Sequence, residues 1–267
     1  MELQGKRVLV VGSGISGIGA VEALCHTGAL PVVFDENDKL SLEEVRKKLK
    51  PGAEAEILIG VLPEETADSI DLVVLSPGVP TDTAFVEKFR KKGIKIWGEI
   101  ELAYELGKGR VIGITGTNGK TTTTTLVGEI MAACYEDVDV VGNIGNPYTL
   151  TALDAEDETV TVAEISSFQL ETVEKFQPDV SAVLNITPDH LNRHHTMEKY
   201  AAAKEAITRN QTKEQVCVLN FENSYTREIG SRCPARVVWF SSKRKLAEGF
   251  YQDGDEIWQA KDGKAMR

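Results

Sequence analysis

The chain has 267 residues, of which 42% are hydrophobic and 27% are charged, as is usual for a globular protein with one or two domains. Its 30 Lys and Arg against 41 Asp and Glu give a net charge of −11, which argues against binding to nucleic acid or to an anionic membrane. The sequence shows no signal-peptide pattern and no apolar run of membrane-spanning length, and its four cysteines form no C-x-x-C pair. We therefore expect a cytoplasmic protein with reduced, buried thiols, acting as a monomer.

The first segment predicts a parallel sheet with a glycine-rich turn. Residues 6–11 form a continuous apolar run, typical of a strand buried on both faces, and Gly12-Ser13-Gly14-Ile15-Ser16-Gly17 follows directly. A helix is predicted over residues 18–27 and a second strand over 31–34, with Asp35 at its end. This turn and acid are the pattern of NAD-binding proteins. The turn selects a pyrophosphate, which other nucleotides also carry, and a turn that only packs a helix on a strand is the alternative.

Strands and helices continue to alternate through the first hundred residues. A strand at 71–75 leads into the turn Ser76-Pro77-Gly78. Alternation with short connections predicts a parallel sheet covered by helices on both faces. We therefore expect a Rossmann-like domain over residues 1–97 and a second α/β domain over residues 98–267. The other elements predicted are strands at 57–59 and 94–97 and helices at 41–50, 85–92 and 99–106.

The second domain begins with a phosphate-binding pattern. An apolar run at 111–114 precedes Thr115-Gly116-Thr117-Asn118-Gly119-Lys120-Thr121, and residues 122–133 are predicted to be helical. This is the layout of a P-loop, whose N–H groups and helix dipole bind phosphate. The strict P-loop spacing would require glycine at Ile114, and a turn that binds nothing is the alternative. We predict a P-loop ATPase-type domain, with Lys120 at the β- and γ-phosphates and Thr121 at Mg²⁺. The predicted nucleotide-binding residues are Gly116, Thr117, Asn118, Gly119, Lys120, Thr121 and Thr122.

A later strand end adds a carboxylate to this site. Residues 159–165 predict a strand that carries Glu164, and an acid at the end of a strand after a P-loop is where a second magnesium contact is expected. An exposed strand-end carboxylate is the alternative. Lys204, within a helix predicted over 198–210, is by itself best explained as a solvated lysine. The remaining predicted elements are strands at 138–141, 180–186, 216–219 and 237–240 and a hairpin over 250–258.

Three of the four histidines follow the strand at 180–186. A zinc site with His190 and His194 on one helix face is disfavoured, because Pro188 disrupts a helix start and no Cys or further acid has ligand spacing. We expect His190 to contact magnesium or substrate beside the P-loop, and His194 and His195 to be surface residues.

Three stretches together resemble the Mur ligases of peptidoglycan synthesis. They are TGTNGKT at 115–121, EISSFQLE at 164–171 and NITPDHLNRH at 185–194. The EISSFQLE run and the Ser76-Pro77-Gly78 turn are most similar to the members that join D-glutamate to UDP-N-acetylmuramoyl-L-alanine. The resemblance implies ATP-driven amide formation, in which the alanine carboxylate attacks the γ-phosphate and the amine of D-glutamate then displaces phosphate from the acyl phosphate.

The resemblance also implies roles for individual residues. Lys120 and Thr121 would hold the phosphates and the first magnesium, and Glu164 and His190 the second magnesium. Lys204 matches a family lysine that is carbamylated and then serves as a metal ligand, which replaces the interpretation as a solvated lysine. The implied catalytic residues are thus Lys120, Glu164, His190 and Lys204, and the implied metal ligands are Thr121, Glu164, His190 and Lys204. The implied substrate-binding residues, which include the cradle for the uridine diphosphate, are Gly14, Ile15, Ser16, Asp35, Ser76, Pro77, Gly78, Asn143, Ser166 and His190.

Members of this family carry a third, C-terminal domain that supplies the amino-acid site, and their central domain continues past the position of Arg267. We therefore expect this chain to be a fragment that does not complete the ligation alone. Two other classes remain, an NAD-dependent oxidoreductase and a nucleotide-binding module without ligase activity. A folate polyglutamate ligase shares the P-loop but would not carry the first domain.

Overall fold

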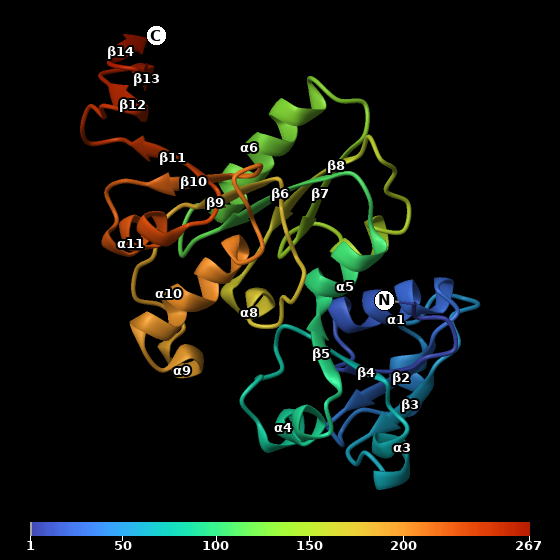
Figure 1. Cartoon of the computed structure of the whole chain (residues 1–267). Helices are drawn as coiled ribbons and strands as arrows, with labels where there is room; N and C mark the ends of the chain where they lie inside the picture. The colour runs from blue at the N-terminus through green and yellow to red at the C-terminus, as the bar shows by residue number, and fades with distance from the viewer. Residues whose placement is uncertain (1) are drawn as a thin grey trace. The chain divides into compact units, whose positions relative to one another are not determined.

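The computed structural model describes residues 2–267, which form two compact units (Figure 1). Unit 1 contains the residues up to Lys108 together with Gly145–Glu156 and Phe168–Phe176. Unit 2 contains Gly109–Ile144, Asp157–Ser167 and Gln177–Arg267. Two segments from the second half of the chain therefore belong to the same unit as the first sheet. The domain boundary predicted from the sequence, between residues 97 and 98, stays a prediction. None of the helices in residues 2–267 is long and apolar enough to cross a membrane.

Unit 1 is built on a five-stranded parallel sheet, as predicted. The strand order is β3-β2-β1-β4-β5, so the chain crosses from one side of β1 to the other after β3. The glycine-rich turn follows β1 at this switch point, where parallel α/β sheets bind their ligands. The elements are β1 (Arg7–Val11), α1 (Ile15–His26), β2 (Leu30–Asp35), α2 (Leu42–Arg46), β3 (Glu56–Ile59), α3 (Glu64–Asp68), β4 (Leu72–Leu75), α4 (Ala84–Lys91), β5 (Lys95–Gly98) and α5 (Glu99–Leu106).

Helices cover both faces of this sheet, and the buried stretches of β1 and β4 consist of apolar residues. Val8 and Val10 pack with α1 residues such as Leu24 on one face, and Leu9 packs with Phe89 of α4 on the other. Successive side chains of a central strand point to opposite faces of the sheet, and both faces are buried. Each central strand is therefore a continuous apolar run in the sequence.

A buried carboxylate ties a late segment to unit 1. Glu101 on α5 has no exposed surface, and it accepts hydrogen bonds from the backbone N–H groups of Glu174 (2.8 Å), Lys175 (2.7 Å) and Phe176 (3.1 Å). Three N–H groups directed at one carboxylate stabilise its charge and fix the path of the segment. The carboxylate is therefore a structural anchor of unit 1.

Replacing Glu101 with alanine is expected to destabilise unit 1 by on the order of 3 kcal/mol or more, because each buried N–H left unpaired costs about 1–3 kcal/mol. Hydrogen exchange of the β1 and β4 amides measures the opening of this unit separately from unit 2. Glu43→Ala, which removes an exposed carboxylate from α2, is the matched control, with a change below about 1 kcal/mol. Equal losses in the two variants would contradict the anchoring role.

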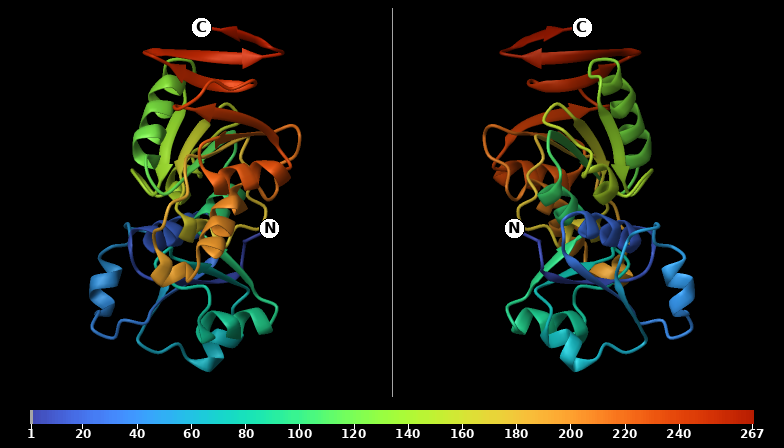
Figure 2. Two further views of the ribbon diagram at one scale, coloured as in Figure 1. Left: turned by 90° about the vertical axis from the view of Figure 1, so that its left-hand side faces the viewer. Right: turned by 90° about the vertical axis from the view of Figure 1, so that its right-hand side faces the viewer.

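Unit 2 is built on a nine-stranded sheet with the order β14-β13-β12-β11-β10-β9-β6-β8-β7. The strands from β7 to β12 are parallel, and β13 and β14 add an antiparallel edge. Figure 2 shows α6 on one face of this sheet and α10 with α11 on the other.

The elements are β6 (Arg110–Thr115), α6 (Lys120–Ala132), β7 (Val138–Gly142), β8 (Val160–Glu164), β9 (Val180–Val183), α9 (Leu191–His194), α10 (Met197–Glu205), η1 (Ala206–Thr208), β10 (Val216–Asn220), α11 (Ser224–Arg232), β11 (Arg236–Ser241), β12 (Gly249–Asp253), β13 (Glu256–Lys261) and β14 (Lys264–Met266). Two further short helices are α7 (Tyr148–Thr151) in unit 1 and α8 (Ser167–Leu170), which begins at the end of a unit 2 segment.

The α/β fold and its two sheets confirm the predicted fold class. The structure adds elements that the sequence did not predict, namely the short helices α3, α7, α8 and α9, the helix α11 and the edge strand β14. The helix predicted over 198–210 is shorter, since α10 ends at Glu205 and a single 3₁₀ turn follows. The expectation of buried cysteines holds for Cys217 but is wrong for Cys134, which is exposed just after α6.

Candidate functional site

The P-loop has a fixed shape that depends on residues after β9. Gly119 adopts a left-handed conformation (φ 83°) that favours glycine, and α6 begins directly after it. Asn185 accepts a hydrogen bond from the N–H of Asn118 at 2.8 Å and donates its amide to the carbonyl of Asn118 at 2.9 Å. The N–H of Thr117 donates to the Asn185 carbonyl. The first N–H groups of α6 have no acceptor within the helix, so the loop and helix start form a preorganised anion site.

Lys120 is the first residue of α6, and its ammonium group lies over the loop. The Nζ atom donates to the carbonyl oxygen of Thr117 at 3.0 Å. This contact holds the ammonium group beside the anion site, and the flexible side chain can exchange the carbonyl for phosphate oxygens.

Glu164 ends β8 beside the start of α6 and is buried, with 1% of its surface exposed. Its carboxylate accepts from the Thr121 hydroxyl at 2.8 Å and from the side-chain amide of Asn143 at 2.9 Å. Gly142 (φ 101°) lets the end of β7 lie close to the backbone of Glu164, because a Cβ atom there would lie 2.2 Å from the Glu164 carbonyl oxygen. The structure thus brings Thr121, Asn143 and Glu164 together, and their hydroxyl, amide and carboxylate oxygens are of the type that Mg²⁺ prefers.

Lys204 lies below the P-loop and is 1% exposed. Its Nζ donates to the Gly116 carbonyl at 2.8 Å and lies 4.7 Å from the centre of the Tyr200 ring. Burial and, to a smaller extent, the nearby Lys120 together lower the pKa of the Lys204 ammonium to about 7, against a smaller opposite effect of Asp189. A buried lysine with a pKa near neutrality is partly an uncharged amine, which is the nucleophilic form.

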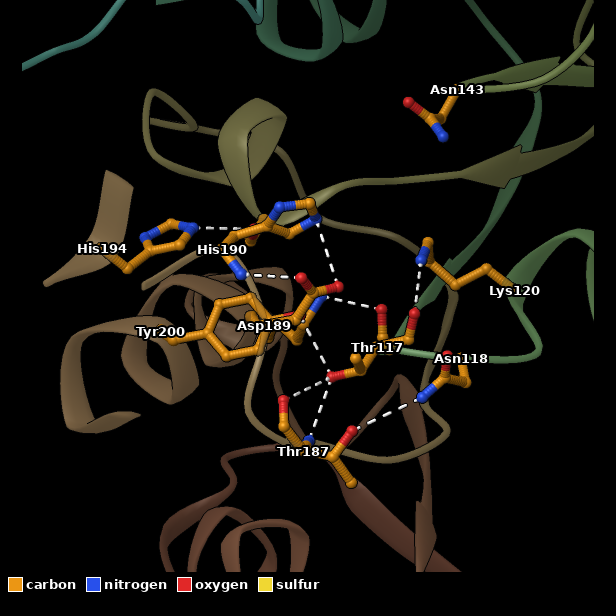
Figure 3. Close-up of polar contacts among 12 residues, drawn as sticks. Thr117, Asn118, Lys120, Asn143, Thr187, Asp189, His190, His194 and Tyr200 are labelled. Atoms are coloured by element: carbon orange, nitrogen blue, oxygen red, sulfur yellow. Dashed lines mark hydrogen bonds and ion pairs between the residues drawn. The ribbon is translucent and has the colours of Figure 1, made fainter. Parts of the chain in front are cut away.

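The histidine segment joins the loop through Tyr200, as Figure 3 shows. The Tyr200 hydroxyl lies 3.1 Å from the Thr117 hydroxyl, and its ring contacts those of His190 and His194. His190 (φ 51°) is about half exposed and lies 3.5 Å from the carboxylate of Asp189. His190 therefore presents an accessible imidazole on the Thr117 side of the loop.

His194 differs from the sequence expectation. The prediction that it is a surface residue is wrong, because it is 5% exposed and its Nε2 lies 2.8 Å from the hydroxyl of Ser167, whereas His195 is exposed. Among residues 2–267, no group of three or more His, Cys, Asp or Glu side chains is placed to hold a metal ion.

Three residues of this site carried no individual prediction. Asn185 and Thr187 lie in a stretch that resembled a known family, and both hold the loop: the N–H of Thr187 donates to the Thr117 hydroxyl at 3.0 Å. Tyr200 gave no signal, because a tyrosine in an amphipathic helix is usually part of the core. Ser166, which the resemblance implied at the substrate, follows β8 two residues after Glu164.

Side chains of unit 1 hold its glycine-rich turn in a fixed shape. Gly17 is required there, because a Cβ atom would lie 1.9 Å from the Gly12 carbonyl oxygen, and α1 begins at Ile15, whose side chain is 80% exposed. Asp35 accepts from the Ser13 N–H at 2.8 Å and from the Ser13 hydroxyl at 2.6 Å. Burial raises the pKa of Asp35, but these hydrogen bonds outweigh it and lower the pKa overall. Asp35 therefore shapes the turn as an ionised acceptor, and Ser76 supports it with a hydrogen bond to the Gly12 carbonyl.

Glu99 lies behind this turn and is 2% exposed. It accepts from the Tyr148 N–H at 3.0 Å and from the Gln169 amide at 3.4 Å, and Ser16 also donates to it. Burial raises the pKa of Glu99 in spite of these hydrogen bonds. Glu99 thus connects Ser16 of the turn to the two late segments of unit 1.

Replacing Glu99 with glutamine is expected to stabilise unit 1. The gain in its free energy of unfolding over the natural chain should grow as pH rises. The folded-state pKa lies above the unfolded value of 4.5, so the contribution of Glu99 is present at low pH and is lost as pH rises through the folded pKa. Hydrogen exchange of the β1 amides at pH 5 and pH 8 measures the difference. A stability difference that is independent of pH, or that shrinks towards pH 8, would contradict the raised pKa. Glu43→Gln on α2 controls for loss of an exposed charge.

Family profiles match both halves of the chain. The profile described as "Mur ligase MurD-like, N-terminal domain" matches residues 6–98, and the profile "Mur ligase middle domain" matches residues 114–265.

Curated relatives match nearly the whole chain. The UDP-N-acetylmuramoylalanine–D-glutamate ligase of Lachnoclostridium phytofermentans is 54% identical over 264 residues, which are 99% of this chain and 58% of that protein. The protein of the same name from Lachnospira eligens is 57% identical over 257 residues, 96% of this chain and 57% of that protein. The chain therefore spans somewhat more than half the length of these relatives.

Solved structures share the fold at low sequence identity. The UDP-N-acetylmuramate:L-alanyl-γ-D-glutamyl-meso-diaminopimelate ligase of Neisseria meningitidis aligns over 98% of this chain and 86% of that chain, with a TM-score of 0.59 and 15% identity. A murein peptide ligase from Psychrobacter arcticus aligns over 94% of this chain and 56% of that chain, with a TM-score of 0.56 and 14% identity. Because the middle-domain profile alone covers more than half of the residues, the chain belongs to the Mur ligase family.

Proposed function

We propose that this chain supplies the nucleotide-sugar-binding and ATP-binding parts of an ATP-dependent ligase that adds D-glutamate to UDP-N-acetylmuramoyl-L-alanine. The names of relatives that are 54% and 57% identical support this reaction. The observation that carries the proposal is the group formed by Thr121, Glu164 and Lys204 around one P-loop. A cytoplasmic, monomeric protein remains our expectation.

In unit 2 the loop N–H groups and Lys120 bind the phosphates of ATP and orient the γ-phosphate. Thr121, Glu164, His190 and Lys204 would hold magnesium, with Lys204 acting as a ligand after carbamylation of its amine. When bound, Mg²⁺ neutralises the charge of the phosphate oxygens. The residues fit this role, since Glu164 is a buried carboxylate with only two neutral donors described and Lys204 is a buried amine of lowered pKa.

In unit 1 the turn at Gly14, Ile15 and Ser16 binds the diphosphate of the nucleotide sugar at the start of α1. Ser76, Pro77 and Gly78 flank the turn after β4. Asp35 positions the turn through Ser13 and lies towards the uridine end. Asn143, Ser166 and His190 of unit 2 contact the reacting end of the substrate.

The chemistry needs positioning more than acid–base catalysis. The alanine carboxylate attacks the γ-phosphorus, which forms the acyl phosphate and releases ADP, and the amine of D-glutamate then attacks the acyl carbon and releases phosphate. The fixed donors of the loop hold the carboxylate and the γ-phosphate in position for the transfer. D-glutamate itself would be bound largely by the part of the relatives that this chain does not span.

The proposal is tested by joining the chain to the remaining C-terminal part of the L. phytofermentans relative and measuring phosphate release. We expect release only when ATP, UDP-N-acetylmuramoyl-L-alanine and D-glutamate are all present, with L-glutamate as the control. Phosphate release that does not depend on D-glutamate, or an absorbance change with NAD, would refute the proposal. The chain alone is expected to give no turnover, and turnover equal to that of the joined protein would contradict the need for the added part.

A further inference from the structure

Lys48, which follows α2, contacts the glycine-rich turn of unit 1. Its Nζ donates a hydrogen bond to the carbonyl oxygen of Ser13 at 3.0 Å. Lys48 is exposed, so its ammonium group is accessible to a ligand at the turn. The turn itself, residues 12–17, contains no Lys or Arg. Lys48 therefore brings a positive charge to a turn that has none of its own.

The backbone on both sides of Lys48 is anchored to α1, the helix that begins at this turn. Val45, three residues before Lys48, has no exposed surface and packs in the same core as Leu24 of α1. Two residues after Lys48, Lys50 donates its backbone N–H to the Glu22 carboxylate at 3.1 Å, and its Nζ lies 3.0 Å from the same carboxylate. Glu22 also belongs to α1 and is 4% exposed. These anchors hold the Lys48 side chain beside the turn.

The surroundings of Lys48 leave its ammonium group available to a ligand. The carboxylates of Asp35 and Glu44 are near enough to interact with it electrostatically. Each of them accepts hydrogen bonds from the N–H and the hydroxyl of one serine, Asp35 from Ser13 and Glu44 from Ser41. The described acceptor of the Lys48 ammonium group is a neutral carbonyl, and an ammonium group has further N–H donors. Lys48 can therefore hold the turn and bind an anion at the same time.

A diphosphate at this turn is attracted by N–H groups but repelled by a neighbouring charge. The N–H groups at the start of α1 and the helix dipole favour an anion. The ionised Asp35, 2.8 Å from the Ser13 N–H, opposes it, because like charges repel. An ammonium group that contacts the same residue of the turn offsets this repulsion and adds a charge-assisted hydrogen bond.

We propose that Lys48 is a further residue of the nucleotide-sugar site and that its ammonium group binds the phosphate attached to the ribose. Lys48 and Asp35 both contact Ser13, so Lys48 lies on the side of the turn that faces the uridine end of the ligand. The inference rests on the proposed function, because it requires a nucleoside diphosphate at this turn. It adds a residue that binds the phosphate by its charge to a turn that otherwise binds through backbone groups.

The inference is tested by titrating the whole chain with UDP and with uridine, by calorimetry for UDP and by NMR for the weaker uridine. In Lys48→Met the affinity for UDP should fall about 10-fold, because a contact between an exposed ammonium group and a phosphate is lost. The affinity for uridine should change by less than about two-fold, since uridine carries no phosphate. Lys47→Met removes the adjacent lysine, which pairs with Glu43 at 3.0 Å, and should bind both ligands as the natural chain does. An unchanged UDP affinity in Lys48→Met, or an equal loss for UDP and uridine, would overturn the inference.

Salt separates a phosphate contact from a purely structural role of Lys48. Raising the NaCl concentration from about 0.05 M to about 0.5 M should narrow the difference in UDP affinity between the natural chain and Lys48→Met, because salt screens contacts between exposed charges. A difference that does not change with salt would show that Lys48 only shapes the turn, and the phosphate contact would be wrong. Absence of UDP binding by the natural chain is a distinct result, which would overturn the proposed nucleotide-sugar site and the role of Lys48 with it.

Discussion

Replacing Lys120 with alanine is expected to lower the affinity of the chain for ATP–Mg²⁺ by about 100-fold or more, since a hydrogen bond to a charged group contributes about 1.5–3 kcal/mol and Lys120 can make more than one. The ammonium group already lies over the loop, 3.0 Å from the Thr117 carbonyl, so little reorganisation precedes binding. The loop itself should keep its shape, because Asn185 and Thr187 hold Asn118 and Thr117. Isothermal titration calorimetry measures the change.

The same variant should bind UDP-N-acetylmuramoyl-L-alanine with an affinity within about two-fold of the natural chain, because Lys120 belongs to unit 2 and the turn that we propose to bind the diphosphate belongs to unit 1. Lys213→Ala removes an exposed lysine of the same unit and serves as the matched control. Equal loss of both ligands in Lys120→Ala would show that one site binds both, and the assignment of two phosphate-binding sites would be wrong.

Replacing Glu164 with glutamine is expected to separate stability from function. The carboxylate is buried, and its described donors, the Thr121 hydroxyl and the Asn143 amide, are neutral. Removing its charge therefore leaves the free energy of unfolding within about 1 kcal/mol, since desolvation of the charged form is avoided. The affinity for ATP in the presence of Mg²⁺ should fall by about 100-fold, because the proposed carboxylate ligand to the metal is lost.

Calorimetry with ATP in Mg²⁺ and in EDTA isolates the metal-dependent part of the affinity. The natural chain should lose affinity when EDTA replaces Mg²⁺, whereas Glu164→Gln should bind equally weakly in both. Glu158→Gln removes an exposed carboxylate just before β8, at the opposite end of the same strand, and should behave as the natural chain. A full magnesium effect in Glu164→Gln would exclude Glu164 as a metal ligand.

The sheet strands and the P-loop were predictable because their signals are local. Residues 8–11 and 72–75 are apolar throughout, and the predicted strands there are β1 and β4. The helix α11 was not predicted, because its buried residues are few and its start depends on Asn223, whose side chain accepts from the Thr226 N–H. The glycine-rich turn and Asp35 alone are also compatible with NAD binding, and it was the resemblance to a known family that identified the ligase fold.

The environment of the site residues could not be predicted, because it arises from distant contacts. Lys204 looked solvated, yet it is buried against the Gly116 carbonyl, 88 positions away in the chain. His194 looked exposed, yet it meets Ser167 from a segment that precedes it by 27 residues. Both residues lie on the α9–α10 segment, which contacts the P-loop through Lys204 and the start of α8 through His194, and no periodicity in the sequence reports these contacts.

The central claim, two independent phosphate-binding sites in one chain, is tested most directly by calorimetric titration of the chain with ATP–Mg²⁺ and with UDP-N-acetylmuramoyl-L-alanine, each alone and each after saturation with the other. We predict one molecule of each ligand bound per chain, with neither displacing the other and with NAD giving no heat. Mutual displacement, or no binding of ATP–Mg²⁺ at all, would contradict the account.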